Sequence, residues 1–136
     1  MRLLGVRAAV LAIVLAGCAT PMPKGLTKAE GQLFLDTVGE LTQAVTQAKD
    51  ASGGIIRRIE QEWSGLTPRT PTVRLKEKWV YADKKEREGW MFKLFRDYNA
   101  VLTKRGLPTV DRFLLQTPLF WEEWFPPELR AGDAKP

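Results

Sequence analysis

The N-terminal segment constrains this chain most, because it decides which residues are left to fold. Arg2 and Arg7 make the start of the chain positive, and residues 8–16 form an uninterrupted apolar run, AAVLAIVLA. A positive start, a short apolar stretch and small residues before a cleavage site are the layout of a secretory signal peptide. The run is shorter than the about 20 residues that a membrane-spanning helix needs. We therefore expect residues 1–17 to be removed, which leaves the rest of the 136-residue chain to fold.

The only cysteine of the chain follows directly after this segment. Leu15, Ala16, Gly17 and Cys18 resemble the lipobox of bacterial lipoproteins, and all four positions match. The resemblance implies cleavage before Cys18, a diacylglyceryl group on its sulfur and a further acyl chain, such as palmitate, on its amino group. Two or three acyl chains anchor a protein far more firmly than a single chain, which binds only marginally. A lipidated thiol needs no disulfide partner, which accounts for a lone cysteine.

The residue after the cysteine bears on the destination of the protein. Aspartate at this position commonly signals retention in the inner membrane of two-membrane bacteria, and this chain has Ala19 there. The resemblance therefore implies an anchor in the outer membrane, on the periplasmic face. Residues 18–26 contain two prolines and a glycine and are interpreted as a short, stiff tether. Residues 27–130 are expected to be the folded domain, and residues 131–136 a disordered tail.

The first part of the domain has the pattern of a helix. Thr27 and Glu30 have the spacing of a capping box. The apolar residues that follow recur every three or four positions, as on one helix face: Phe34, Val38, Leu41, Val45 and Ala48. The same rhythm resumes at Ile55 and Ile59, so residues 27–64 are interpreted as one long helix or a helical hairpin. We favour packing within the domain over a coiled coil, which needs three or four sustained heptads.

The second part is also expected to be largely helical. Residues 84–105 carry a broad apolar face, and Gly106 suits the position just past a helix end. Residues 72–81 alternate as a strand would, but they also fit a helix face and have no evident strand partner. Thr109 and Thr117 are placed to begin short helices. The sequence thus predicts a mostly α domain of about four to five helices.

An aromatic segment near the C-terminus is the first candidate functional feature. It holds four large rings within six residues: Phe120, Trp121, Trp124 and Phe125. On a helix these rings would complete a small core, which is the favoured interpretation. A docking segment is the second, because tryptophan is enriched at binding hot spots. Contact with the bilayer interface is the third. Glu122 and Glu123 argue against it, because an anionic membrane surface would repel their carboxylates. We expect one tryptophan to be buried and the other to lie at an edge.

A basic stretch is the second candidate. Residues 69–105 contain 11 Lys and Arg but only 5 Asp and Glu. Five of the cations are candidates for contact with lipid head groups, lipopolysaccharide phosphates or an acidic partner: Lys84, Lys85, Arg87, Lys93 and Arg96. A solvated helix surface with interleaved glutamates is the alternative, and we favour it. Nucleic acid is not an expected partner of an exported, anchored protein.

Signs of catalysis are weak in this sequence. The chain has no histidine, the commonest general base and metal ligand, and no phosphate-binding glycine loop or G-x-S-x-G motif. We expect no cofactor, no metal and no enzymatic activity, but an accessory or scaffolding subunit that binds an envelope protein or the cell wall. One alternative is an enzyme acting on peptidoglycan, with Glu123 as its acid. Another is a phage- or plasmid-encoded envelope lipoprotein of the spanin or entry-exclusion type.

Overall fold

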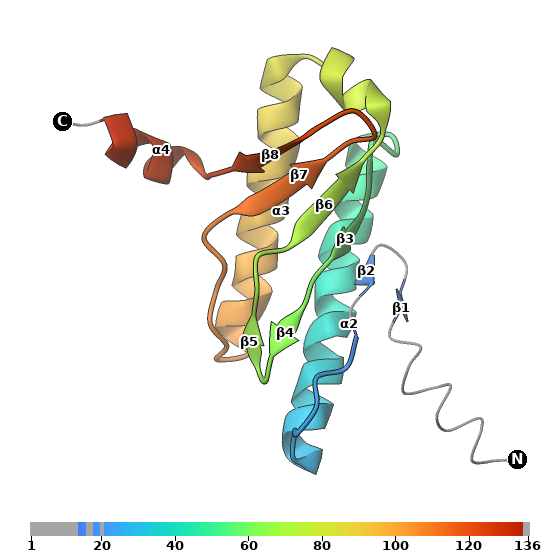
Figure 1. Cartoon of the computed structure of the whole chain (residues 1–136), viewed down its shortest axis with the longest axis vertical. Helices are drawn as coiled ribbons and strands as arrows, with labels where there is room; N and C mark the ends of the chain where they lie inside the picture. Colours follow the sequence, from blue (N-terminus) through green and yellow to red (C-terminus); the bar gives the residue numbers. More distant parts are fainter. Residues whose placement is uncertain (1–13, 16–17, 20, 135–136) are drawn as a thin grey trace, which may run out of the picture.

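The computed structural model describes residues 14–15, 18–19 and 21–134, and it is an α+β fold (Figure 1). The described helices are α2 (Lys28–Ala51), the 3-10 helix η1 (Glu77–Tyr81), α3 (Lys84–Lys104) and α4 (Pro127–Ala134). The strands of the main sheet are β1 (Val14–Leu15), β2 (Cys18–Ala19), β3 (Ile56–Glu60), β6 (Thr72–Leu75), β7 (Phe113–Gln116) and β8 (Trp121–Trp124). A small hairpin adds β4 (Trp63–Ser64) and β5 (Thr67–Pro68). The prediction of a mostly α domain with four to five helices is therefore wrong.

The main sheet has the strand order β1-β2-β3-β6-β7-β8. Strands β3 and β6 are antiparallel, β6 and β7 are parallel, and β7 and β8 are antiparallel. The parallel step is the crossover that α3 makes possible, because parallel neighbours need a long connection. Helices α2 and α3 pack together behind the sheet as drawn in Figure 1, and no helix of the described chain covers the front.

Helix α2 begins as predicted. The Thr27 hydroxyl accepts from the backbone N–H of Glu30 at 3.1 Å, and the Glu30 carboxylate accepts from the N–H of Thr27 at 2.9 Å. Phe34, Val38 and Leu41 of the predicted apolar face are buried. A capping box satisfies two backbone donors that a helix start would otherwise leave unpaired. This local signal was therefore sufficient to predict where α2 begins.

The end of α2 differs from both interpretations of residues 27–64. The helix stops at Ala51, and Gly53 and Gly54 turn the chain with φ values of 63° and 88°. The following segment is strand β3. Its Ile56 and Ile59 are three positions apart, like a helix face, yet both are buried because the register with β6 shifts between residues 56 and 58. Such a bulge changes which side of the strand the next residues face.

Strands also replace helices in the later part of the domain. Residues 72–81, left open above, form strand β6 and then the 3-10 helix η1, with Val73, Leu75 and Trp79 buried. The partner strands that the sequence did not reveal are β3 on one side and β7 on the other.

Thr117 was expected to begin a helix, and instead it closes the turn between β7 and β8. Its hydroxyl accepts from the N–H groups of Leu119 and Phe120, both at 3.1 Å. The N–H of Thr117 donates to the carbonyl of Phe120 at 2.9 Å. The same side-chain chemistry that caps a helix also stabilises a turn, which explains the error.

The core lies between the two long helices and the sheet. Its buried aromatic residues include Tyr98 and Phe113, whose rings meet edge to face with centroids 5.9 Å apart. A smaller cluster lies at the N-terminal half of α2, where Met22 and Leu26 pack against Phe34 and Val38. The segment expected to be a tether therefore joins the fold within a few residues of Cys18.

Several sequence expectations concern the chain ends. Residues 1–13 and 16–17 of the expected signal peptide lie outside the described residues. Residues 131–134 of the expected tail form the last part of α4. Within the described residues, none of the helices combines the length and the apolar character that crossing a membrane requires.

Candidate functional site

The helix-free side of the sheet, called the open face below, is the candidate site. Neighbouring residues of a strand point to opposite faces, so Arg74, between buried Val73 and Leu75, points away from the helices. The strand register aligns four side chains across β3, β6, β7 and β8 in one row, which we call the tryptophan row: Arg58, Arg74, Gln116 and Trp121. Four strands thus bring together residues that are up to 63 positions apart in the chain.

A polar network holds the middle of this row. The Glu60 carboxylate accepts from Arg58 Nη2 at 2.9 Å and from Arg74 Nε at 3.0 Å. Arg74 Nη1 also donates to Gln116 Oε1 at 2.7 Å. The hydrogen bond from Arg74, followed by that from Arg58, holds the pKa of Glu60 below its ordinary value despite partial burial. The guanidinium groups are therefore positioned and their charges are partly compensated.

The row ends in an exposed apolar turn. Trp121 is 64% exposed, and it follows Leu119 and Phe120, which are 63% and 37% exposed. We call these three residues the aromatic turn. Large apolar side chains that are exposed next to one another often mark binding surfaces.

The four predicted docking residues lie in different environments. Trp124 is only 6% exposed and stacks on Phe113, with ring centroids 6.0 Å apart. Phe125 lies under the Arg112 guanidinium, 5.0 Å from its ring centroid. Phe120 and Trp121 remain at the surface, joined by Leu119, which sequence reasoning missed because the segment was taken for a helix. The expected split between the tryptophans is found, but through strand alternation and not through helix geometry.

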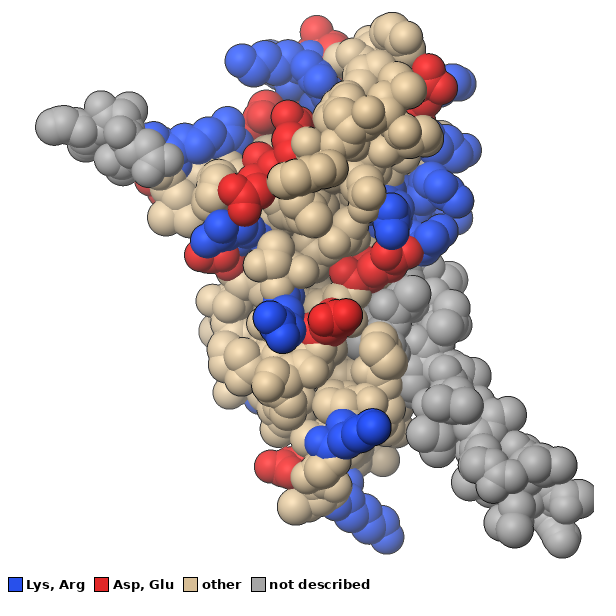
Figure 2. All heavy atoms as spheres, viewed as in Figure 1, with Lys and Arg blue, Asp and Glu red and all other residues tan. Residues whose placement is uncertain are grey.

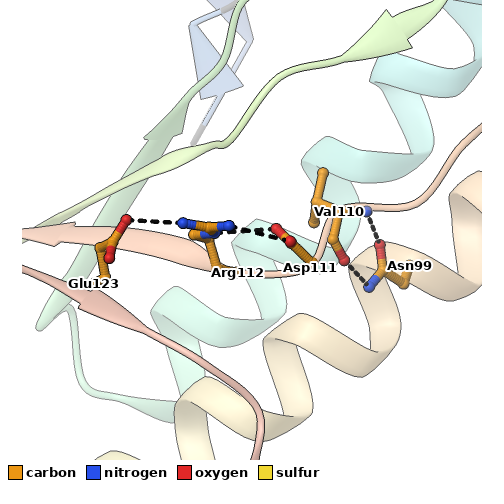
Figure 3. A network of polar contacts seen from close by, with 5 residues as sticks. All are labelled: Asn99, Val110, Asp111, Arg112 and Glu123. Carbon is orange, nitrogen blue, oxygen red and sulfur yellow. Dashed lines mark hydrogen bonds and ion pairs between the residues drawn. The ribbon is translucent and has the colours of Figure 1, made fainter. Parts of the chain in front are cut away.

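A second polar network fixes β7 against its neighbours (Figure 3). Arg112 Nη1 donates to Glu123 Oε2 at 3.0 Å, and Arg112 Nε donates to Asp111 Oδ1 at 3.1 Å. These bonds lower the pKa of Asp111 and raise that of Arg112. Asn99 of α3 exchanges two hydrogen bonds of 2.9 Å with the backbone of Val110. The turn is thus presented on a hairpin that is pinned to α3.

Glu123 was the candidate acid of the enzymatic alternative. Its Oε2 atom is held in the ion pair with Arg112, and its side chain lies on the surface. Among the described residues, no three His, Cys, Asp or Glu side chains gather into a possible metal-binding group. The open face therefore offers hydrogen bonds and an aromatic surface.

The predicted basic residues of α3 do not form one uniform patch. Lys93 is paired with Asp97 at 2.5 Å, and the Arg96 guanidinium lies 5.6 Å from the centroid of the Phe92 ring. Arg87 lies over the buried Trp79, 5.8 Å from its ring centroid. Lys84 and Lys85 are exposed at the start of the helix, and no ion pair of theirs is found in the described part of the chain.

A polar cleft of about 590 Å³ borders the polar network at the other end of the open face. The described residues that line it are Pro21, Glu60, Gln61, Glu62, Arg69, Thr70 and Thr72. Gln61 is buried at its base, where it accepts a hydrogen bond from the Tyr98 hydroxyl and donates to the carbonyl of Arg69 at 2.8 Å. Glu60 belongs both to this cleft and to the network of the tryptophan row.

Comparison with known proteins gives no family for this chain. No protein-family model matches it, and no significantly similar curated protein or solved structure was found.

Proposed function

We propose that this protein is a lipoprotein anchored in the outer membrane on its periplasmic face. In this proposal it is a non-catalytic accessory or scaffolding subunit that binds another envelope component through the open face. The observation that carries the proposal is the aromatic turn, where three adjacent large apolar side chains are exposed on a hairpin with defined hydrogen bonds. A few large side chains of this kind supply most of the affinity at many interfaces.

The core does not require the aromatic turn. The covered face of the sheet is completed by other residues, among them Phe113, Leu115 and Trp124, all of them buried. Leaving a tryptophan in water forfeits the stabilisation that its burial would give. A binding role for Trp121 accounts for its exposure, because a partner would then cover it.

The position of the anchor supports the same proposal. The backbone of Cys18 lies in β2 at one side of β3, whereas β8 is the strand at the opposite end of the sheet order. Four strand spacings of about 4.8 Å separate them, or about 19 Å. From Cys18 to the packed Met22 the chain spans at most about 14 Å. A lipid on Cys18 would therefore keep the β3 side of the domain near the membrane and the aromatic turn farther from it.

The proposal is tested by analysing the protein recovered from envelopes. Mass spectrometry should show a mature chain that begins at Cys18 and carries acyl groups, and Cys18→Ser should accumulate as an uncleaved precursor. Crosslinking of intact cells should then capture an envelope component with the native protein and lose it with Trp121→Ala. A mature chain with an unmodified thiol, or a crosslinking pattern that Trp121→Ala does not change, would contradict the proposal.

A further inference from the structure

We infer that the component bound by the open face is a glycan strand of the cell wall, with Trp121 as the platform on which a sugar ring stacks. This inference deepens the proposed function and rests on it, since it names the partner of the same surface. It depends on three properties of the open face: an aromatic platform, a row of hydrogen-bonding groups beside it and the balance of charge.

The platform is the indole ring of Trp121. Its side chain lies on the open face of β8, which is an end strand of the described sheet, and is 64% exposed. One face of a pyranose ring consists of C–H groups, which pack against the electron-rich face of an aromatic ring. Tryptophan also provides a large, rigid contact area with few rotatable bonds to immobilise.

The hydrogen-bonding groups continue directly from the platform. Gln116 lies opposite Trp121 in the register, and its Oε1 accepts from Arg74. That bond orients the amide so that its NH₂ group, which has no partner in the described part of the chain, can donate to a ligand. The tryptophan row crosses three strand spacings, about 14 Å. A short stretch of polysaccharide can lie along such a row, with one sugar on Trp121 of β8 and a polar side chain on each of the other three strands.

The charges of the open face favour a neutral, hydroxyl-rich ligand. Arg58 and Arg74 share Glu60, and Arg112 is paired with Asp111 and Glu123. Because these two networks together hold three arginines and three carboxylates, a strongly acidic or basic partner gains little. Covering the network with a dry protein interface would cost desolvation of both arginines and the carboxylate. Sugar hydroxyls can replace the water around these groups, since each both donates and accepts hydrogen bonds.

The surface seen in Figure 2, in the same view as the open face of Figure 1, agrees with this balance. Residues other than Lys, Arg, Asp and Glu cover most of its middle, and acidic and basic groups adjoin one another in several places, mostly in the upper part. The polar cleft beside Glu60 and Thr72 extends the hydrogen-bonding surface beyond the tryptophan row. A glycan that continues past the row would meet polar groups there as well.

The test uses the full-length mature lipoprotein in detergent micelles, with purified peptidoglycan sacculi and soluble N-acetylglucosamine oligosaccharides as probes. Co-sedimentation measures binding to sacculi, and tryptophan fluorescence measures the oligosaccharide titration. We expect Trp121→Ala to weaken binding at least tenfold and Gln116→Ala to weaken it several-fold. The matched control is Tyr81→Ala, because Tyr81 is also an aromatic residue, 78% exposed, but lies on η1 outside the row. It should bind as the native protein does.

Thermal unfolding of each variant separates a lost ligand contact from a lost fold, and Trp121→Phe provides a second variant that keeps an aromatic platform. Partial recovery of binding in Trp121→Phe supports stacking. The inference is overturned if the native protein binds neither probe, or if Trp121→Ala binds both unchanged. A crosslinked protein that depends on Trp121, together with no glycan binding, would overturn the glycan but leave the proposed function intact. Absence of lipid on Cys18 and of any Trp121-dependent partner would instead remove the proposed function.

Discussion

The two tryptophans of β8 lie three residues apart and face opposite sides of one sheet. Trp124 is on the covered side, where it stacks on Phe113, lies 5.5 Å from the ring centroid of Phe95 and donates from Nε1 to Glu88. Trp121 is on the open side, next to Gln116. The covered face contributes stability through packed apolar contacts. The open face holds its polar groups in place without burying them, which is what a binding surface requires.

The largest expected effect comes from Trp124→Ala. Removing this buried ring leaves a cavity against Phe113 and Phe95 and should lower the free energy of unfolding by about 3–5 kcal/mol. Trp121→Ala should change it by no more than about 0.5 kcal/mol, as at ordinary surface positions. Denaturant unfolding of the two variants, measured side by side, checks the difference. Equal losses of stability would mean that Trp121 contributes to the fold as much as Trp124 does, which would contradict a stabilising role for the covered face alone.

A buried polar contact sharpens the comparison from the covered side. Tyr98→Phe removes the hydroxyl that donates to the buried Gln61 Oε1. A buried acceptor that loses its donor typically costs about 1–3 kcal/mol. We expect a loss in this range by thermal or denaturant unfolding. Tyr81→Phe is the control, because Tyr81 is exposed and its hydroxyl contacts solvent. A similar loss in both variants would argue against this role of Gln61.

The smallest effect is expected on the open face, in the pH dependence of Glu60→Gln. The pKa of Glu60 is lowered in the folded state, so its ion pairs stabilise the fold above the unfolded pKa of about 4.3. That contribution is lost as the pH falls through the lower folded-state value. Because the pairs are partly exposed, we expect a difference below about 1 kcal/mol at pH 7. Melting temperatures of the native protein and the variant should converge in acid, and a constant difference down to pH 2 would refute the assignment.

Helix α2 could be predicted because its signals are local. The capping box needs only Thr27 and Glu30, and the apolar rhythm needs only the residues of one helix. The end of the helix was harder to predict. Gly53 and Gly54 marked a break, but the spacing of Ile55 and Ile59 continued the helical rhythm. In the structure Ile55 only precedes β3, and a bulge in that strand brings Ile56 and Ile59 to the core.

The candidate site depended on contacts that periodicity cannot reveal. Arg74 bonds to Gln116 across 42 positions, and the exposure of Trp121 follows from the register of β8 on β7. The sequence singled out the aromatic segment as a feature of interest. Its geometry was wrong because Thr117, read as a helix start, closes a hairpin turn. A helix would have put residues 121 and 124 about 60° apart, whereas the strand puts them on opposite faces.

The most direct test of the different roles of the two faces is photo-crosslinking in living cells. A photoreactive phenylalanine analogue, which keeps an aromatic ring at the platform, replaces Trp121 and, separately, Tyr81. If the open face binds an envelope component away from the membrane, position 121 should yield a defined adduct with the cell wall or a periplasmic partner, and position 81 should yield much less. Adducts of position 121 with phospholipid alone, or equal yields at the two positions, would contradict the account.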